Sequence, residues 1–225
     1  MNHASQARAD TSMMMVVHRA FLRDLGLMSE EVGRPVAHSG RRRRLLASRW
    51  RHFRRCLELH HVAEDTKLWP LLLARADEAD REEVRELEAE HALLDPLLTA
   101  TSAAFDDFAA GRGGAPQHVV ELLHEMRDLL VRHLKHEESL LPMMADHVSP
   151  GEWEAFVEPQ RRADSPASSR WFLLWLLEDA PAPARHRLLS RRTPVERLML
   201  KRFWEPLHSR RLRATFDRVH GNLGG

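Results

Sequence analysis

The sequence has no tyrosine and a single cysteine, Cys56, and only three of its 34 basic residues are lysines. The absence of tyrosine excludes a tyrosyl radical and a tyrosine metal ligand. One cysteine cannot form an intramolecular disulfide or a cysteine-rich metal site. No apolar run reaches membrane-spanning length and no secretory leader is recognisable, so we expect a cytoplasmic protein without a membrane span. The formal net charge of +1 gives the whole chain no bias toward anionic partners.

What the sequence contains is the pattern of four amphipathic helices. Its 225 residues are 43% hydrophobic and 30% charged, a globular composition that is long enough for one core and an appendage. Apolar residues recur at helical spacing in four segments, separated by GRP at 33–35, ADEAD at 76–80 and GRGGAP at 111–116. Short connections between long helices favour antiparallel neighbours. We therefore expect an all-α fold, with an up-down-up-down four-helix bundle over residues 11–148.

Residues 149–225 have a different character. They predict an additional C-terminal segment of short helices, interrupted by prolines. We expect a basic helical tail that packs on the bundle through its tryptophans, Trp153, Trp171, Trp175 and Trp204. Residues 185–218 include eleven basic and three acidic residues. This local surplus of positive charge suits nucleic acid or an anionic membrane, but arginine-rich helix faces are ordinary in an arginine-biased chain, so nucleic acid is not the partner we expect.

Polar residues interrupt the apolar stripe of each bundle helix. The interruptions are His18, His60 with Glu64, His91, and His133 with Glu137. Counted from the expected helix ends, His60, His91 and His133 lie at similar depth in the bundle. Burying imidazoles and carboxylates together without a cation costs several kcal/mol, on the order of the desolvation of each group. Two carboxylates with several imidazoles suit a pair of iron ions.

These residues resemble the hemerythrin-like (HHE cation-binding) domain family. The matching stretches cover residues 11–146: VVHRAFLRDL around His18, HHVAEDTKLWPLL at 60–72, EH at 90–91 and HLKHEESLLPMM at 133–144. The resemblance implies a four-helix bundle that holds a non-haem di-iron centre bridged by carboxylates or by an oxo group. It also implies terminal ligands at His18, His60, His91 and His133, and bridging ligands at Glu64 and Glu137.

The sequence departs from the family's oxygen carriers one turn after His91. Where those proteins have a further histidine, this chain has Asp95, so a fifth histidine ligand is expected from His61 or His136, or Asp95 itself contacts a ligand. It is also open whether His60 or His61 takes the ligand position of the second segment. His61 stands as far before Pro70 as His133 stands before Pro142, which favours His61. We prefer His60 because it lies on the apolar stripe. Two further acids are expected to orient imidazole N–H groups or to face solvent, Asp65 and Glu138.

The function expected from these features is to bind or reduce a small oxidant: oxygen, hydrogen peroxide or nitric oxide. An oxygen- or peroxide-reducing oxidoreductase and a redox or oxygen sensor both fit, each with a reductant or partner protein that the sequence does not identify. Manganese or zinc suit the same ligands. One alternative is a ferritin-like di-iron carboxylate oxidase, suggested by Glu-x-x-His at Glu58, Glu88 and Glu121. Another is a metal-stabilised module whose basic tail binds a partner or nucleic acid, although no DNA-reading motif is present.

Overall fold

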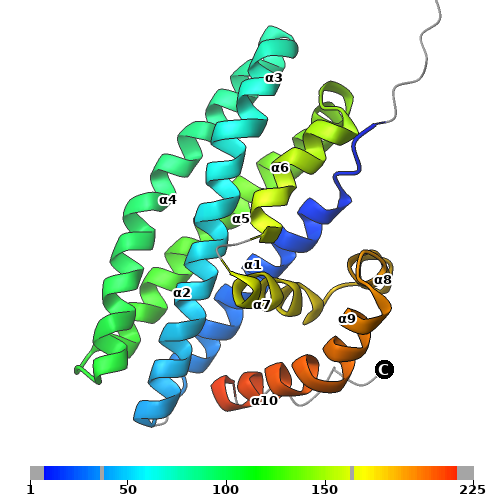
Figure 1. Cartoon of the computed structure of the whole chain (residues 1–225). Coiled ribbons are helices and arrows are strands. Elements are labelled where there is room, and N and C mark those ends of the chain that lie inside the picture. Colours follow the sequence, from blue (N-terminus) through cyan, green and yellow to red (C-terminus); the bar gives the residue numbers. More distant parts are fainter. Residues whose placement is uncertain (1–7, 36–37, 163–164, 217–225) are drawn as a thin grey trace, which may run out of the picture.

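The computed structural model describes residues 8–35, 38–162 and 165–216, and every regular element within these ranges is helical. The predicted all-α fold class is confirmed, with a helical bundle followed by extra C-terminal helices (Figure 1). In chain order the elements, of which η1 and η2 are π-helical turns, are α1 (Ser12–Val32), α2 (Gly40–Ala63), η1 (Glu64–Leu68), α3 (Trp69–Arg75), α4 (Glu78–Ala110), α5 (Ala115–His147), α6 (Pro150–Arg162), α7 (Pro166–Leu177), α8 (Ala182–Ser190), α9 (Pro194–Met199), η2 (Leu200–Trp204) and α10 (Glu205–Thr215).

Four rods form the bundle: α1, the continuous rod α2–η1–α3, α4 and α5 (Figure 1). Residue types at the helix ends account for their limits. Ser39 and Asp77 precede α2 and α4, and each side chain accepts a hydrogen bond from the backbone amide three residues on. Gly111 ends α4 with φ 78°, and a Cβ there would lie 2.7 Å from the guanidinium of Arg43. Only glycine therefore fits this turn without strain.

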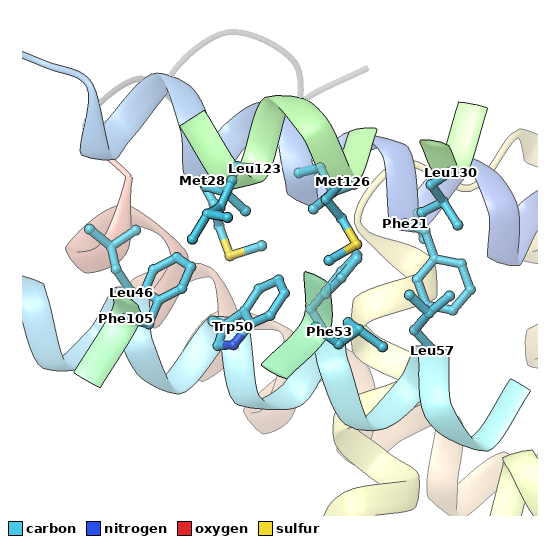
Figure 2. Close-up of a cluster of buried hydrophobic side chains, with 14 of the residues drawn as sticks. Phe21, Met28, Leu46, Trp50, Phe53, Leu57, Phe105, Leu123, Met126 and Leu130 are labelled. Atoms are coloured by element: carbon cyan, nitrogen blue, oxygen red, sulfur yellow. The ribbon is translucent and has the colours of Figure 1, made fainter. Parts of the chain in front are cut away.

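Two apolar clusters fill the bundle, and a layer of buried polar side chains lies where they meet. The larger cluster stacks aromatic rings from facing helices, among them Phe21, Trp50, Phe53 and Phe105 (Figure 2). The smaller cluster lies toward the other end and includes Met14, Leu68, Trp69, Leu87 and Met144. On α4 His91 falls between Leu87 of the smaller cluster and Leu94 of the larger, while on α1 and α5 His18 and His133 lie near the end of the larger cluster.

The helices α6, α7, α8 and α10 share these cores with the bundle. Trp175, Leu212 and Phe216 belong to the larger apolar cluster, and Trp153 and Phe156 belong to the smaller one. No helix in the described ranges is long and apolar enough to cross a membrane. The division into a bundle domain at 11–148 and a tail at 149–225 stays a prediction, since a shared core does not show whether either part folds alone.

Candidate metal centre

Five histidines and two glutamates converge in the polar layer of the bundle. All seven side chains are buried, and Glu64 and Glu137 have no exposed surface at all. Their ligand atoms form two groups in which every pair of atoms lies within 4.8 Å: one from His61, His91 and His133, the other from His18, His60 and Glu137. The sequence-predicted residues of all four rods are thus brought together, with His61 as the fifth histidine.

Glu64 lies between the two groups. Its Oε1 is 3.1 Å from Nε2 of His60, which belongs to one group, and its Oε2 is 3.6 Å from Nε2 of His91, which belongs to the other. Glu137 approaches the centre from α5, with Oε2 3.2 Å from Nε2 of His18. Glu64 is therefore close to both groups, whereas Glu137 belongs to the group of His18 and His60.

The atoms of this centre that are suited to bind a metal have no hydrogen-bond partners among the described residues. The Nε2 atoms of all five histidines and all four carboxylate oxygens of Glu64 and Glu137 are buried without a partner of hydrogen-bond geometry among the described residues. Buried polar groups in folded proteins are nearly always satisfied, so nine unsatisfied atoms that face one another need an explanation. Coordination to metal ions would satisfy these atoms, and the imidazole and carboxylate donor set fits iron, manganese or zinc.

Acidic side chains outside this group hold three of the imidazoles in place. The Nδ1–H groups of His18, His91 and His133 donate to Glu138, Asp65 and Glu90 at 2.9, 2.8 and 2.8 Å. A hydrogen bond at Nδ1 fixes the tautomer, so that Nε2 presents its lone pair to the centre. Sequence reasoning gave this position to Asp65 and Glu138 as one of two possibilities, the other being exposure to solvent, and it missed Glu90, which directly precedes His91.

Two of the sequence candidates lie outside the centre. Asp95 is exposed on α4 and belongs to neither ligand group. His136 faces the bundle surface, where its two ring nitrogens lie 3.0 Å from Glu90 and 2.8 Å from Glu83. It thus contacts the acid that holds His133 and makes no approach to the two ligand groups.

The turn η1 explains how the two neighbouring histidines both face the interior. Adjacent residues on an α-helix point about 100° apart, so His60 and His61 face different ligand groups, and Glu64 lies between them in angle one turn later. The amide of Trp69 then donates to the carbonyl of Glu64, five residues earlier. This wider turn accommodates one extra residue and keeps Trp69 in the core. The extra residue also explains why the spacing from His60 to Pro70 is one residue longer than the spacing from His133 to Pro142.

Burial and mutual charge shift the pKa values of the centre's protein groups. Burial lowers the pKa of His60 to about 3 and that of His61 well below its usual value. Burial and the neighbouring Glu137 raise the pKa of Glu64. Burial acts in the same direction on Glu137, but the surrounding histidines outweigh it and lower its pKa. Neutral imidazoles are the form that binds metal, and a bound cation favours the ionised form of both carboxyls.

Comparison with known proteins agrees with this geometry. The family model "Hemerythrin HHE cation binding domain" matches residues 9–149, which span the four rods and all seven residues of the centre. Neither curated proteins nor solved structures gave a match. With more than half of the sequence matched, this chain belongs to the hemerythrin HHE cation-binding domain family.

Proposed function

We propose that the protein holds two iron ions in this centre and uses them to bind or reduce a small oxidant: oxygen, hydrogen peroxide or nitric oxide. The observation that carries the proposal is the convergence of nine unsatisfied buried donor atoms in two groups. His61, His91 and His133 would hold one ion, His18 and His60 the other, and Glu64 and Glu137 would bridge them. Two irons in such a site supply one-electron redox chemistry at each metal.

The unequal number of histidines supports a place for the oxidant. Three imidazoles lie on one side of the centre and two on the other, so an ion held by His18 and His60 would have one imidazole fewer and could bind the oxidant there. Phe21 packs there, with its ring 5.6 Å from that of His60, and is fully buried. Its role would be to exclude bulk water and to leave room only for small molecules. A small-molecule or protein reductant must then return the electrons.

The experiment that tests this function uses the full chain loaded anaerobically with ferrous iron. Oxygen, hydrogen peroxide and nitric oxide are added separately, and the visible and near-ultraviolet spectrum is followed with time. We expect at least one oxidant to change the spectrum in proportion to the bound iron, and Glu137→Ala to abolish the change. An iron-loaded protein that responds to none of the three would contradict the proposal.

The ferritin-like alternative receives no support from the geometry. It requires glutamates of the Glu-x-x-His pairs to enter the centre. Glu88 and Glu121 are exposed, and Glu58 is half-buried and accepts a hydrogen bond from Arg54 at 2.7 Å. None of the three belongs to the ligand groups of the polar layer.

A sensing role is a second candidate, and one contact favours it. The ring of Phe21 lies 5.6 Å from that of His60 and 5.3 Å from that of Trp175 on α7, so one side chain touches both the centre and the tail. A contact alone does not establish coupling. A sensor requires that limited proteolysis of the tail differ between the oxidised and reduced iron-loaded protein, and that Phe21→Leu remove the difference.

A further inference from the structure

Exposed apolar side chains gather on one stretch of the tail. Among the described residues, eight large hydrophobic side chains are exposed, and five of them lie between positions 195 and 207. Their exposed fractions run from 36% for Met199 to 70% for Val195. Such side chains scattered singly need no explanation, but a cluster of this kind marks an interaction surface. The five residues, called here the apolar ridge, are Val195, Leu198, Met199, Phe203 and Leu207.

The backbone keeps the ridge on one side of α9, η2 and α10. Residues four apart drift by about 40° per step around a regular α-helix. The π-helical turn η2 reverses this drift, because its turn is wider. Val195, Met199, Phe203 and Leu207 therefore share a face. The neighbouring face, about 100° further around the helix, packs inward and is formed by Leu200, Trp204, His208 and Leu212.

Unpaired cations flank the ridge. Within residues 194–215 there are six basic and two acidic residues. Both acids are engaged locally, since Glu196 caps α9 through Thr193 and Glu205 binds Arg185 at 2.6 Å. Five of the cations are exposed and make no ion pair with any residue that the structure describes: Arg197, Lys201, Arg202, Arg210 and Arg213.

We propose that the apolar ridge and its flanking cations bind the surface of an anionic phospholipid membrane. Arginine and lysine around an exposed ridge of Phe, Leu, Met and Val are suited to a boundary where apolar chains meet negative headgroups. The segment lies at the outer edge of the molecule, on the side away from α4 (Figure 1). The ridge would enter the headgroup region while the bundle stays outside the bilayer.

Charge argues against two other occupants. A second copy of the chain facing the same surface would bring its five unpaired cations against an identical set, which costs energy at low salt. Nucleic acid would pair with the cations, but contact with phosphates and sugars leaves an aliphatic and aromatic ridge without a partner. An anionic bilayer satisfies both components of the surface.

The test is sedimentation of the full chain with vesicles, either of phosphatidylcholine alone or of phosphatidylcholine mixed with phosphatidylglycerol. We expect binding to the mixed vesicles only, and weaker binding as salt is raised. Phe203→Asp should abolish it, whereas Leu93→Asp, at an equally exposed apolar position on α4, should leave it unchanged. Reversing Lys201 and Arg202 to Glu should weaken binding by about fivefold or more per charge.

Charge reversal elsewhere provides the second control. Arg127 and Arg132 are exposed on α5, so their replacement by Glu changes the net charge equally without touching the ridge, and binding should persist. Helical circular dichroism of each variant establishes that it is folded. Equal binding to both vesicle types, or none to either, overturns the proposal. So does concentration-dependent dimerisation that Phe203→Asp removes, which would assign the ridge to a second copy.

Discussion

His61 decides how many imidazoles the centre has. It stacks on His91 with ring centroids 4.0 Å apart and belongs to the three-histidine group, while Asp95 is exposed. This chain would thus supply its fifth imidazole from the residue next to His60, on the second rod of the bundle. The number of histidine ligands would then equal that of the family's oxygen carriers, which have their further histidine one turn after the position of His91.

Removing this imidazole gives the first prediction. We expect His61→Ala to lower the iron bound after anaerobic reconstitution by about half, because one of the two ions loses a direct ligand. Asp95→Ala serves as the control and should bind as much iron as the unaltered chain. Iron is measured by elemental analysis against protein concentration. Equal iron in both variants would remove His61 from the ligand set.

Glu90 gives the second prediction. It accepts a hydrogen bond from Nδ1 of His133 at 2.8 Å and lies outside the ligand groups. Glu90→Gln should weaken iron binding by about 10- to 100-fold, which is typical when the group that orients a ligand is changed. Competition with a chelator measures the affinity. Glu88→Gln, at an exposed position on the same helix, should leave the iron affinity unchanged. An equal loss of affinity in both variants would mean that the overall negative charge, and not the hydrogen bond to His133, affects iron binding.

The apolar stripes in the sequence predict some residues of the centre and not others, because a stripe marks only one face of a helix. A polar residue on an apolar stripe is visible in the sequence, so His18, His91 and Glu137 could be assigned from spacing. His61 could only be offered as an alternative, because a stripe marks one direction, whereas a site for two ions would span about 100° of α2. Glu90 could not be assigned, since an acid beside a stripe is usually solvated.

At the scale of elements, the two π-helical turns are what periodicity could not predict. The breaks between rods follow from Gly, Pro and capping residues, and α1, α4 and α5 begin and end close to the expected positions. A stripe counted at 3.6 residues per turn has no place for an inserted residue. In η1 the insertion is absorbed between Glu64 and Trp69, so the core is in register on both sides of it.

This interpretation of η1 gives the third prediction. Deleting Lys67, which is exposed, should convert the turn into regular α-helix and leave the residues before and after it facing the core. Deleting Arg55 from the regular part of α2 should rotate one side of the rod by about 100° against the other and unfold the bundle. Thermal unfolding followed by circular dichroism compares the two. Similar damage from both deletions would contradict the inserted-residue account.

At the scale of the whole molecule, a buried ionic network ties the tail to the bundle. Arg49 of α2 binds Asp24 of α1 at 2.6 Å and Glu178, just after α7, at 2.8 Å. Glu178 also contacts Arg23 at 3.2 Å and His208 of α10 at 2.8 Å. Four separate segments therefore meet at one carboxylate.

The fourth prediction concerns the pH dependence of this network. Burial would raise the pKa of Glu178, but Arg49, His208 and Arg23 outweigh it and lower the pKa from 4.5 to about 2. A lowered pKa means that the network's stabilisation is complete above pH 4.5 and is lost as pH falls toward 2. Glu178→Gln should cost about 3 kcal/mol at neutral pH, because it leaves buried arginines short of a counter-charge.

Urea unfolding of the unaltered chain and of Glu178→Gln, repeated across this pH range, isolates the contribution of the carboxyl. The difference between the two free energies of unfolding should shrink as the pH is lowered, since the protonated carboxyl and the amide are then equally uncharged. Glu82→Gln, which removes an exposed partner of Arg85, is the control and should have little effect. A difference that does not change with pH would exclude the ionised carboxyl as its source.

The measurement that tests the central claim most directly is the iron content of the full chain after anaerobic ferrous reconstitution, taken together with its absorption spectrum. The account predicts about two irons per chain, with near-ultraviolet bands that bleach with dithionite and return with an oxidant. It also predicts that His133→Ala, which removes a ligand from the three-histidine group, lowers that iron content. A reconstituted chain that binds no stoichiometric metal, or whose iron is unaffected by His133→Ala, would contradict it.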